Sequence, residues 1–236
     1  MNDADKLRVA SYNIRKAIGG DYKRNPARVE TVIGSLGADI VALQEGDYRF
    51  RGRAALFEPE ALYASTGMRV IDLDNRSPGL GWHGNILMVG PDVKIERVRT
   101  IDLPGLEPRG AVTVHLDVHG RPLQVIAAHL GLFARNRKLQ AATLVQAIDP
   151  SDDVPVIVMG DFNGWGRAPR SLLPFQEALA EVSCGPSYPA SRPITPLDRL
   201  FYGGPLVPTA SGVWRDDPAR MASDHLPIWA EFRHDD

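Results

Sequence analysis

The chain has 236 residues, 44% of them hydrophobic and 24% charged, which is the composition of a globular protein and excludes a disordered or fibrous one. Its formal net charge of −2 weighs against tight, non-specific nucleic-acid binding, which depends on neutralising phosphates with Lys and Arg, although a local basic patch would suffice for a nuclease. The single cysteine, Cys184, excludes an intrachain disulfide, and no stretch approaches the ~20 apolar residues of a membrane span.

The first third of the chain alternates between strand and helix patterns. Asn25 followed by Pro26 opens a helix, because Asn caps helices and Pro suits their first position, and Gly37 ends it. The apolar run 39–44 predicts a strand covered on both faces. The predicted elements are a strand over 7–14, a helix from 26 to about 36, a strand over 39–44, a basic loop over 49–53, a helix over 54–66 and a strand over 69–73.

The middle of the chain changes to short strands separated by turn signals. These signals are Gly90-Pro91-Asp92, Pro104-Gly105 and His119-Gly120. The strands are predicted over 85–89, 93–101, 111–118 and 123–129. Their even spacing predicts an antiparallel meander.

The last third returns to a mixture of elements. Asp149-Pro150 ends a predicted helix, and a Pro- and Ser-rich loop precedes the closing strands. The predicted elements are helices over 135–148 and 171–179, a strand over 154–159, a loop over 184–196, and strands over 198–202, 207–213 and 227–232. No linker divides the chain, so we expect one domain over 1–236. Two packed sheets with helices outside would account for this α/β mixture.

Oxygen donors and imidazoles recur where the predicted strands begin or end. Each alone suits a cap, a turn or a hydrogen-bonded core histidine, but a core has no need for so many. Hard cations such as Mg²⁺ or Mn²⁺ prefer carboxylate and amide oxygens. Asp224 and His225 are adjacent, so cooperation between them requires a turn or separate roles. The set comprises Asn13, Glu45, His129, Asp161, Asn163, Asp198, Asp224 and His225.

The motifs around these residues, taken together and in order, resemble those of the endonuclease/exonuclease/phosphatase superfamily. They are Ser11-Tyr12-Asn13-Ile14, Leu43-Gln44-Glu45, Ala128-His129-Leu130, Gly160-Asp161-Phe162-Asn163, Leu197-Asp198-Arg199-Leu200 and Ser223-Asp224-His225-Leu226-Pro227. The resemblance implies a four-layered α/β sandwich with two packed mixed β-sheets flanked by helices. It also implies a divalent-metal-dependent phosphoesterase.

The resemblance implies metal and water positions at four of these residues. Asn13 and Glu45 would bind the divalent ion, Mg²⁺ or Mn²⁺. Asp224 would assist the metal or orient a histidine. Asp161 would orient the water that attacks the phosphoryl group in line.

The resemblance also implies roles for the remaining catalytic candidates. His225 would be a general base or a phosphate contact, and His129 a general acid or phosphate ligand. Asn163 would bind the scissile phosphate, and Asp198 matches the family's aspartate before a closing strand. Arg199 stands where relatives often carry histidine, which puts in doubt any role of that histidine here.

Asn85 and Arg109 are candidate substrate-binding residues, although Arg109 suits an ordinary loop arginine equally well. Trp165 suits either substrate stacking or a loop cap, whereas Trp214 and Trp229 suit the core. A basic groove would draw on Arg49, Arg51, Arg53, Arg135, Arg137 and Lys138, which equally suit a solvated surface.

Several substrate classes remain open from the sequence. The leading class is a phosphodiester in nucleic acid, a phospholipid head group or a small molecule. A phosphomonoesterase of a sugar or inositol phosphate comes second, and a catalytically silent phosphate- or partner-binding module third. The N-terminus at residues 1–6 is polar, so we expect no signal peptide, a cytoplasmic location and no stable membrane insertion.

Overall fold

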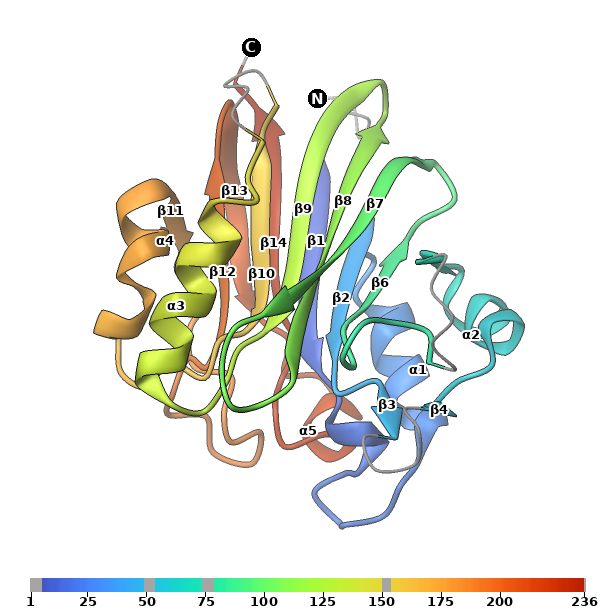
Figure 1. Ribbon diagram of the computed structural model, residues 1–236. Helices are drawn as coiled ribbons and strands as arrows, with labels where there is room; N and C mark the ends of the chain where they lie inside the picture. The colour runs from blue at the N-terminus through green and yellow to red at the C-terminus, as the bar shows by residue number, and fades with distance from the viewer. Residues whose placement is uncertain (1–5, 49–53, 74–78, 150–153, 236) are drawn as a thin grey trace.

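Two six-stranded mixed sheets form the centre of the computed structural model, which describes residues 6–48, 54–73, 79–149 and 154–235 (Figure 1). The first sheet has the order β13 (Leu206–Val213), β14 (Ile228–His234), β1 (Leu7–Asn13), β2 (Ile40–Gln44), β6 (Ile86–Val89), β5 (Arg69–Val70). The second has the order β11 (Ala180–Val182), β12 (Asp198–Gly203), β10 (Val156–Asp161), β9 (Arg121–His129), β8 (Arg109–Val118), β7 (Val93–Leu103).

Helices cover the outer face of each sheet, which confirms the predicted four-layered sandwich. The helices on the first sheet are α1 (Pro26–Ser35), α2 (Pro59–Thr66) and α5 (Ala219–Ala222), and those on the second are α3 (Ala134–Val145) and α4 (Leu173–Ala178). Short elements complete the fold: η2 (Arg15–Ala17), η3 (Arg170–Leu172), β3 (Asp47–Tyr48) and β4 (Ala54–Ala55). Across the four described ranges, no helix is both long and apolar enough to cross a bilayer.

Alternation of side chains along the strands builds the layers. In β2, Ile40 and Ala42 face the central core between the sheets, whereas Val41 and Leu43 face α1 and α2. Because successive side chains of a strand point to opposite faces, a strand that is apolar throughout serves two cores at once. The apolar run at 39–44 is therefore buried on both faces, as predicted.

Several elements differ from the sequence-based expectations. The predicted helix over 171–179 is divided into η3 and α4, β11 was not predicted, and the predicted helix over 135–148 ends at Val145. The predicted helix over 54–66 begins only at Pro59, because a residue before proline avoids helical backbone, and Ala54–Ala55 form β4 instead. The predicted strand over 69–73 is only Arg69–Val70. The strand at 85–89 is β6, which pairs with β2 in the first sheet, so only β7, β8 and β9 form the meander. The basic loop at 49–53 lies outside the described residues.

Two parallel strand pairs bring the polar strand ends together. β1 lies parallel to β2, and β9 lies parallel to β10. The carboxyl ends of parallel neighbours meet at one edge of a sheet, so Asn13 lies near Glu45, and His129 is the register partner of Asp161. Both edges lie at the lower end of the sandwich in Figure 1.

Gly160 lets β10 pass close to β9 immediately before Asp161. Its φ is +155°, and a Cβ at this position would lie 1.8 Å from the carbonyl oxygen of Ala128. We expect Gly160→Ala to lower the free energy of unfolding by ~1–3 kcal/mol, the usual cost of overpacking. Denaturant unfolding measures this change. Gly20→Ala is the control, because its Cβ would meet only a backbone oxygen at 3.9 Å. Equal stability of both variants would contradict the close approach.

Candidate active site

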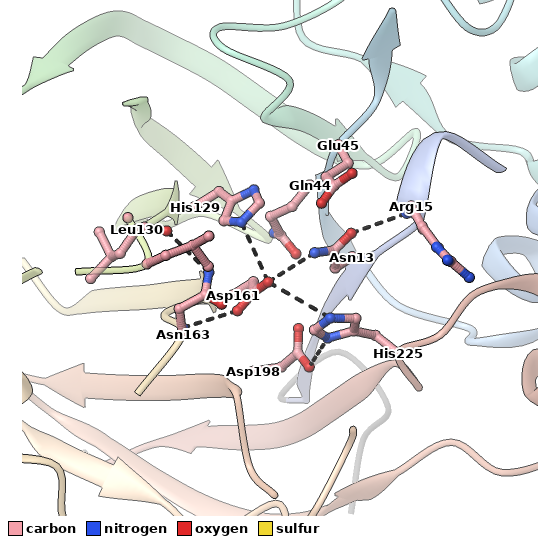
Figure 2. Close-up of polar contacts among 12 residues, drawn as sticks. Asn13, Arg15, Gln44, Glu45, His129, Leu130, Asp161, Asn163, Asp198 and His225 are labelled. Atoms are coloured by element: carbon pink, nitrogen blue, oxygen red, sulfur yellow. Dashed lines mark hydrogen bonds and ion pairs between the residues drawn. The ribbon is translucent and has the colours of Figure 1, made fainter. Parts of the chain in front are cut away.

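Asp161 is the centre of a polar cluster that joins the two sheets (Figure 2). Its side chain is 2% exposed, and its Oδ2 accepts a hydrogen bond from Asn13 Nδ2 at 2.8 Å. The same oxygen lies 3.4 Å from His129 Nε2 and 3.8 Å from His225 Nε2. Oδ1 accepts the backbone N–H of Asn163 at 3.0 Å. One carboxylate therefore connects groups from both halves of the sandwich.

His225 and Asp198 form a buried pair beside this carboxylate. His225 Nδ1 lies 2.8 Å from Asp198 Oδ2, which also accepts a hydrogen bond from Ser187 Oγ at 2.5 Å. Asp198 is the first residue of β12 and the register partner of Asp161, so strand pairing sets its position. The carboxylate orients the ring and leaves Nε2 directed toward Asp161.

The electrostatics of the cluster favour an imidazolium at neutral pH. Burial raises the pKa of the Asp161 carboxyl, and the nearby ring of His225 opposes this shift. Burial alone would lower the pKa of His225, but the carboxylates of Asp198 and Asp161 outweigh it and raise that pKa from 6.5 to about 10. Because His225 lies between two carboxylates, we assign the retained proton to its ring.

Asp224 and His225 make separate contacts. His225 faces Asp198 and Asp161, whereas Asp224 Oδ2 pairs with Arg15 Nε at 3.3 Å. Ser223 Oγ donates to the carbonyl oxygen of Asn13 at 2.7 Å, which fixes this turn against the end of β1.

Glu45 is paired in the same way as Asp224. Lys16 Nζ forms an ion pair with Glu45 Oε2, and both side chains are about one-quarter exposed. Arg15, Lys16 and Glu45 all have positive φ angles, of 45°, 55° and 57°. Non-glycine residues rarely adopt this conformation, and it is concentrated at functional sites. The loop after β1 thus places Lys16 beside Glu45 and Arg15 beside Asp224, the two carboxylates that are predicted metal ligands.

The structure offers two places for a cation. Asp161, Asp198 and His225 have ligand atoms within 4.8 Å of one another. Both ring nitrogens of His225 already face carboxylates there, so a positive charge is already present.

Glu45 and Asp224 are more accessible: Glu45 follows Gln44, the register partner of Asn13, and Asp224 follows Ser223, whose hydroxyl donates to the Asn13 carbonyl oxygen. The oxygens of Glu45 and Asp224 suit a hard divalent ion. We refer to the polar residues at the strand ends as the strand-end cluster: Asn13, Glu45, His129, Asp161, Asn163, Asp198, Asp224 and His225.

A small pocket opens beside Glu45. Its lining residues are Lys16, Glu45, Asp47, His83, Pro108, Arg109 and His129. Arg109 is only 7% exposed, and its guanidinium binds Glu107 Oε2 at 3.0 Å and 3.3 Å. Contact of Arg109 with a phosphate stays a prediction. Basic and imidazole groups thus surround a carboxylate, an arrangement that suits a phosphate next to a metal.

The side chains of Asn85 and Asn163 form hydrogen bonds with backbone carbonyl oxygens around the site. The amide nitrogen of Asn85 donates to the carbonyl oxygens of Trp82 and Gly110, at 3.0 Å and 2.9 Å, and so positions the strand that begins with Arg109. Asn163 Nδ2 donates to the Leu130 carbonyl at 3.1 Å and joins the loops that follow β9 and β10. These bonds orient the site; direct contact of either residue with substrate stays a prediction.

Among the described candidates for a basic groove, one is buried and two are exposed. Arg137 is 7% exposed and donates to the carbonyl oxygens of Gly131 and Leu132. It therefore stabilises the loop after β9 and does not contribute to a basic surface. Arg135 and Lys138 are exposed, whereas Arg49, Arg51 and Arg53 lie outside the described residues. Trp214 and Trp229, assigned to the core, are partly buried and lie against the guanidinium of Arg8.

Sequence reasoning missed Arg15, Lys16, Ser187 and Tyr188. The two basic residues directly after Asn13-Ile14 were a usable signal, because a metal-binding strand end followed by cations suits a phosphate. Ser187 and Tyr188 lie in the Pro- and Ser-rich loop and contact Asp198 and His225 only through the tertiary fold.

Comparisons with known proteins agree with this geometry. The chain is similar to the uncharacterized protein YbhP of Escherichia coli (strain K12), with 29% identity over 165 residues that cover 64% of this chain and 63% of YbhP. It therefore spans less than two thirds of the length of the curated relatives it first matches.

Two solved structures share the fold at 18% identity. D. rerio TDP2 in complex with a single-strand DNA product has a TM-score of 0.70, covering 97% of this chain and 99% of that one. The mannosyl-6-phosphatase Bt3783 of Bacteroides thetaiotaomicron has a TM-score of 0.73, covering 96% and 99%. The family model described as Endonuclease/Exonuclease/phosphatase family matches residues 10–225, from β1 to His225. With the strand-end cluster in place, the chain belongs to the endonuclease/exonuclease/phosphatase family of phosphoesterases.

Proposed function

We propose that the protein is a divalent-metal-dependent phosphodiesterase that hydrolyses its substrate by in-line attack of water. The observation that carries this proposal is the buried Asp161 carboxylate, which contacts Asn13 and faces His129 and His225 at one end of the sandwich. A base, a proton donor and an anion-binding pocket lie around one point, as transfer of a phosphoryl group to water requires.

The roles of the chain's own residues follow from their charges. Asp161 accepts the proton of the attacking water, because burial raises its pKa and makes it a better base. His225 remains protonated beside Asp198, so it binds a phosphoryl oxygen rather than acting as the base. His129 lies beside Asp161 in the same pocket as Arg109, where both groups can contact the phosphate. As the bond between phosphorus and the leaving oxygen breaks, His129 would donate a proton to that oxygen.

We assign the metal to Glu45, Asn13 and Asp224, with Mg²⁺ or Mn²⁺ as the ion. The donor set consists of two carboxylates and an amide oxygen, which suits these hard cations. Lys16 pairs with Glu45 and Arg15 pairs with Asp224, so both carboxylates are already stabilised by a nearby positive charge. When bound, the ion would neutralise charge on the non-bridging phosphoryl oxygens.

This assignment predicts opposite effects at the two partners of one ion pair. Glu45→Gln should weaken Mn²⁺ binding about tenfold or more, a loss on the scale of metal-site partners. Lys16→Met should strengthen it roughly 1.5- to 5-fold, because a partly exposed pair worth ~0.2–1 kcal/mol no longer competes with the ion. Isothermal titration calorimetry measures both affinities. Lys23→Met, an exposed lysine of the same loop, is the control. Unchanged Mn²⁺ affinity in Glu45→Gln would refute the assignment.

The function itself is tested with two chromogenic substrates. Bis-p-nitrophenyl phosphate is a diester and p-nitrophenyl phosphate a monoester, and each is assayed with EDTA, Mg²⁺ or Mn²⁺. We expect metal-dependent turnover of the diester. Turnover of the monoester alone would replace the proposal with a phosphomonoesterase. Silence on both, together with no measurable Mn²⁺ binding, would favour a catalytically silent binding module.

A further inference from the structure

Trp165 presents a large aromatic ring to solvent next to the site. Its side chain is 61% exposed although it lies two residues beyond Asn163. A single exposed apolar residue is common on protein surfaces and identifies no site by itself. Two further features distinguish Trp165: the rings that connect it to the site, and the support of its loop.

A series of aromatic rings leads from the imidazole of His225 to Trp165. The Tyr188 ring packs against His225 with centroids 4.9 Å apart. Trp165 packs edge-on against the same Tyr188, at 6.2 Å and an interplanar angle of 80°. The contact is T-shaped, and most of the indole surface remains exposed and available to a ligand. A single aromatic ring, that of Tyr188, therefore separates the indole from the imidazole of His225.

Arg199 holds the loop that carries Trp165. Its side chain is 3% exposed, and its guanidinium donates to the carbonyl oxygens of Gly164, Gly166 and Arg167, at 3.1 Å, 2.5 Å and 3.1 Å. It also pairs with Glu181 at 2.5 Å. Burying a charge is costly unless it is paired and hydrogen-bonded, and here the bonds fix an exposed loop. The loop is therefore preorganised, which reduces the entropy that a ligand must overcome on binding.

Charge limits the size of the ligand. The net charge of −2 disfavours a long polyanion, whereas Arg15, Lys16 and Arg109 supply positive charge at the site. An aromatic platform next to a few cations suits a phosphate that carries a planar ring. Proteins that bind single-stranded nucleic acid without sequence preference combine these two features.

We propose that the indole of Trp165 is a stacking platform for a nucleobase attached to the scissile phosphate, and that Arg199 is a positioning residue that holds this platform. The inference rests on the proposed phosphodiesterase function and names its substrate class, which is short nucleotide diesters.

The test compares dithymidine monophosphate with analogues in which a tetrahydrofuran residue replaces one base or the other. Base stacking is worth ~1–3 kcal/mol, so Trp165→Ala should raise KM for the dinucleotide roughly 5- to 150-fold. We expect kcat to stay within about twofold, since the indole is remote from the reacting atoms. Trp165→Phe should recover most of the loss. For one of the two abasic analogues, Trp165→Ala should leave KM unchanged.

Tyr63→Ala provides the matched control, because Tyr63 is an exposed aromatic residue (48%) on α2, away from the strand-end cluster. Arg199→Lys should raise KM in the same direction as Trp165→Ala. The variant could also destabilise the protein, so the inference is judged on Trp165, whose side chain is exposed. Calorimetric binding of the dinucleotide in EDTA gives a readout that does not depend on hydrolysis.

The outcomes separate this inference from the proposed function. An unchanged KM and an unchanged dinucleotide affinity in Trp165→Ala would overturn the stacking platform while leaving phosphodiesterase activity intact. Loss of binding to phosphatidylglycerol vesicles, with no effect on the dinucleotide, would also overturn it and assign Trp165 to a lipid surface. Trp165-dependent dinucleotide binding without hydrolysis of any ester would support the platform and refute the enzyme.

Discussion

His225→Gln is expected to lower kcat/KM for the preferred diester by ~10²–10³-fold, the loss typical of removing one electrostatic contact to an oxygen that gains charge in the transition state. Glutamine retains a hydrogen-bond donor near Asp198 but carries no positive charge toward the phosphoryl oxygen. The measurement is steady-state kinetics with Mg²⁺ or Mn²⁺ near neutral pH. Full activity of this variant on every ester tested would show that the site is assigned to the wrong residues.

The same substitution is also expected to destabilise the protein, because His225 lies between two buried carboxylates. Removing one partner of a buried pair commonly costs ~3–5 kcal/mol, because the remaining charge has no compensation. A loss of activity must therefore be measured at a temperature well below the midpoint of the variant.

The difference in the free energy of unfolding between the wild type and His225→Gln should decrease as pH rises. The folded-state pKa of His225 is raised to about 10 from an ordinary value of 6.5. The stabilisation from the charged ring is therefore fully present below pH 6.5 and is lost as pH rises toward 10. Denaturant unfolding of metal-free protein at pH 6.5, 8 and 10 measures the difference. His119→Asn is the control, because this exposed turn residue has a φ of 54°, which Asn tolerates.

Asp161→Asn should reduce turnover at least as strongly as the histidine substitution, by ~10²–10⁴-fold. The change keeps the shape of the side chain but removes the base. It also places an amide where Asn13, His129 and His225 currently face a carboxylate oxygen. Steady-state kinetics on the diester tests this expectation, and Asp92→Asn, at an exposed turn, is the control.

A second readout of Asp161→Asn distinguishes the electrostatic role from a structural one. Asp161 is one of the carboxylates that raise the pKa of His225, so its neutralisation should move that pKa down toward the ordinary value. Titration of the ring by NMR in metal-free protein measures the shift. An unchanged His225 pKa, together with unchanged kinetics, would show that the two side chains are not coupled.

The sequence predicted the strand ends well because each motif carries its own local signal. An apolar run followed by a polar residue identifies both the strand and the edge at which its side chains collect, as at Asp161 and Glu45. The sandwich followed from the same alternation. What local patterns do not contain is pairing between distant segments, so β6 was assigned to the wrong neighbours.

Side-chain contacts within the site could not be predicted either, because they also join segments that lie far apart in the sequence. The contact of Ser187 with Asp198 depends on a loop that has no periodicity, and the support of the Trp165 loop by Arg199 joins residues more than thirty positions apart. Arg199 appeared in the sequence only as a departure from a family pattern. Its burial and its hydrogen bonds to the carbonyl oxygens of the Trp165 loop are visible only in the structure.

The site spans the boundary between the two sheets, and this has a consequence for synthesis of the protein. Asn13 belongs to β1, whereas Asp161 belongs to β10 and His225 precedes β14, which pairs with β1. These groups lie far apart in the sequence. The proposed hydrolytic activity can therefore arise only after the ribosome has released the residues of β14 and this strand has paired with β1. The nascent polypeptide would therefore not hydrolyse phosphate esters until β14 has paired with β1.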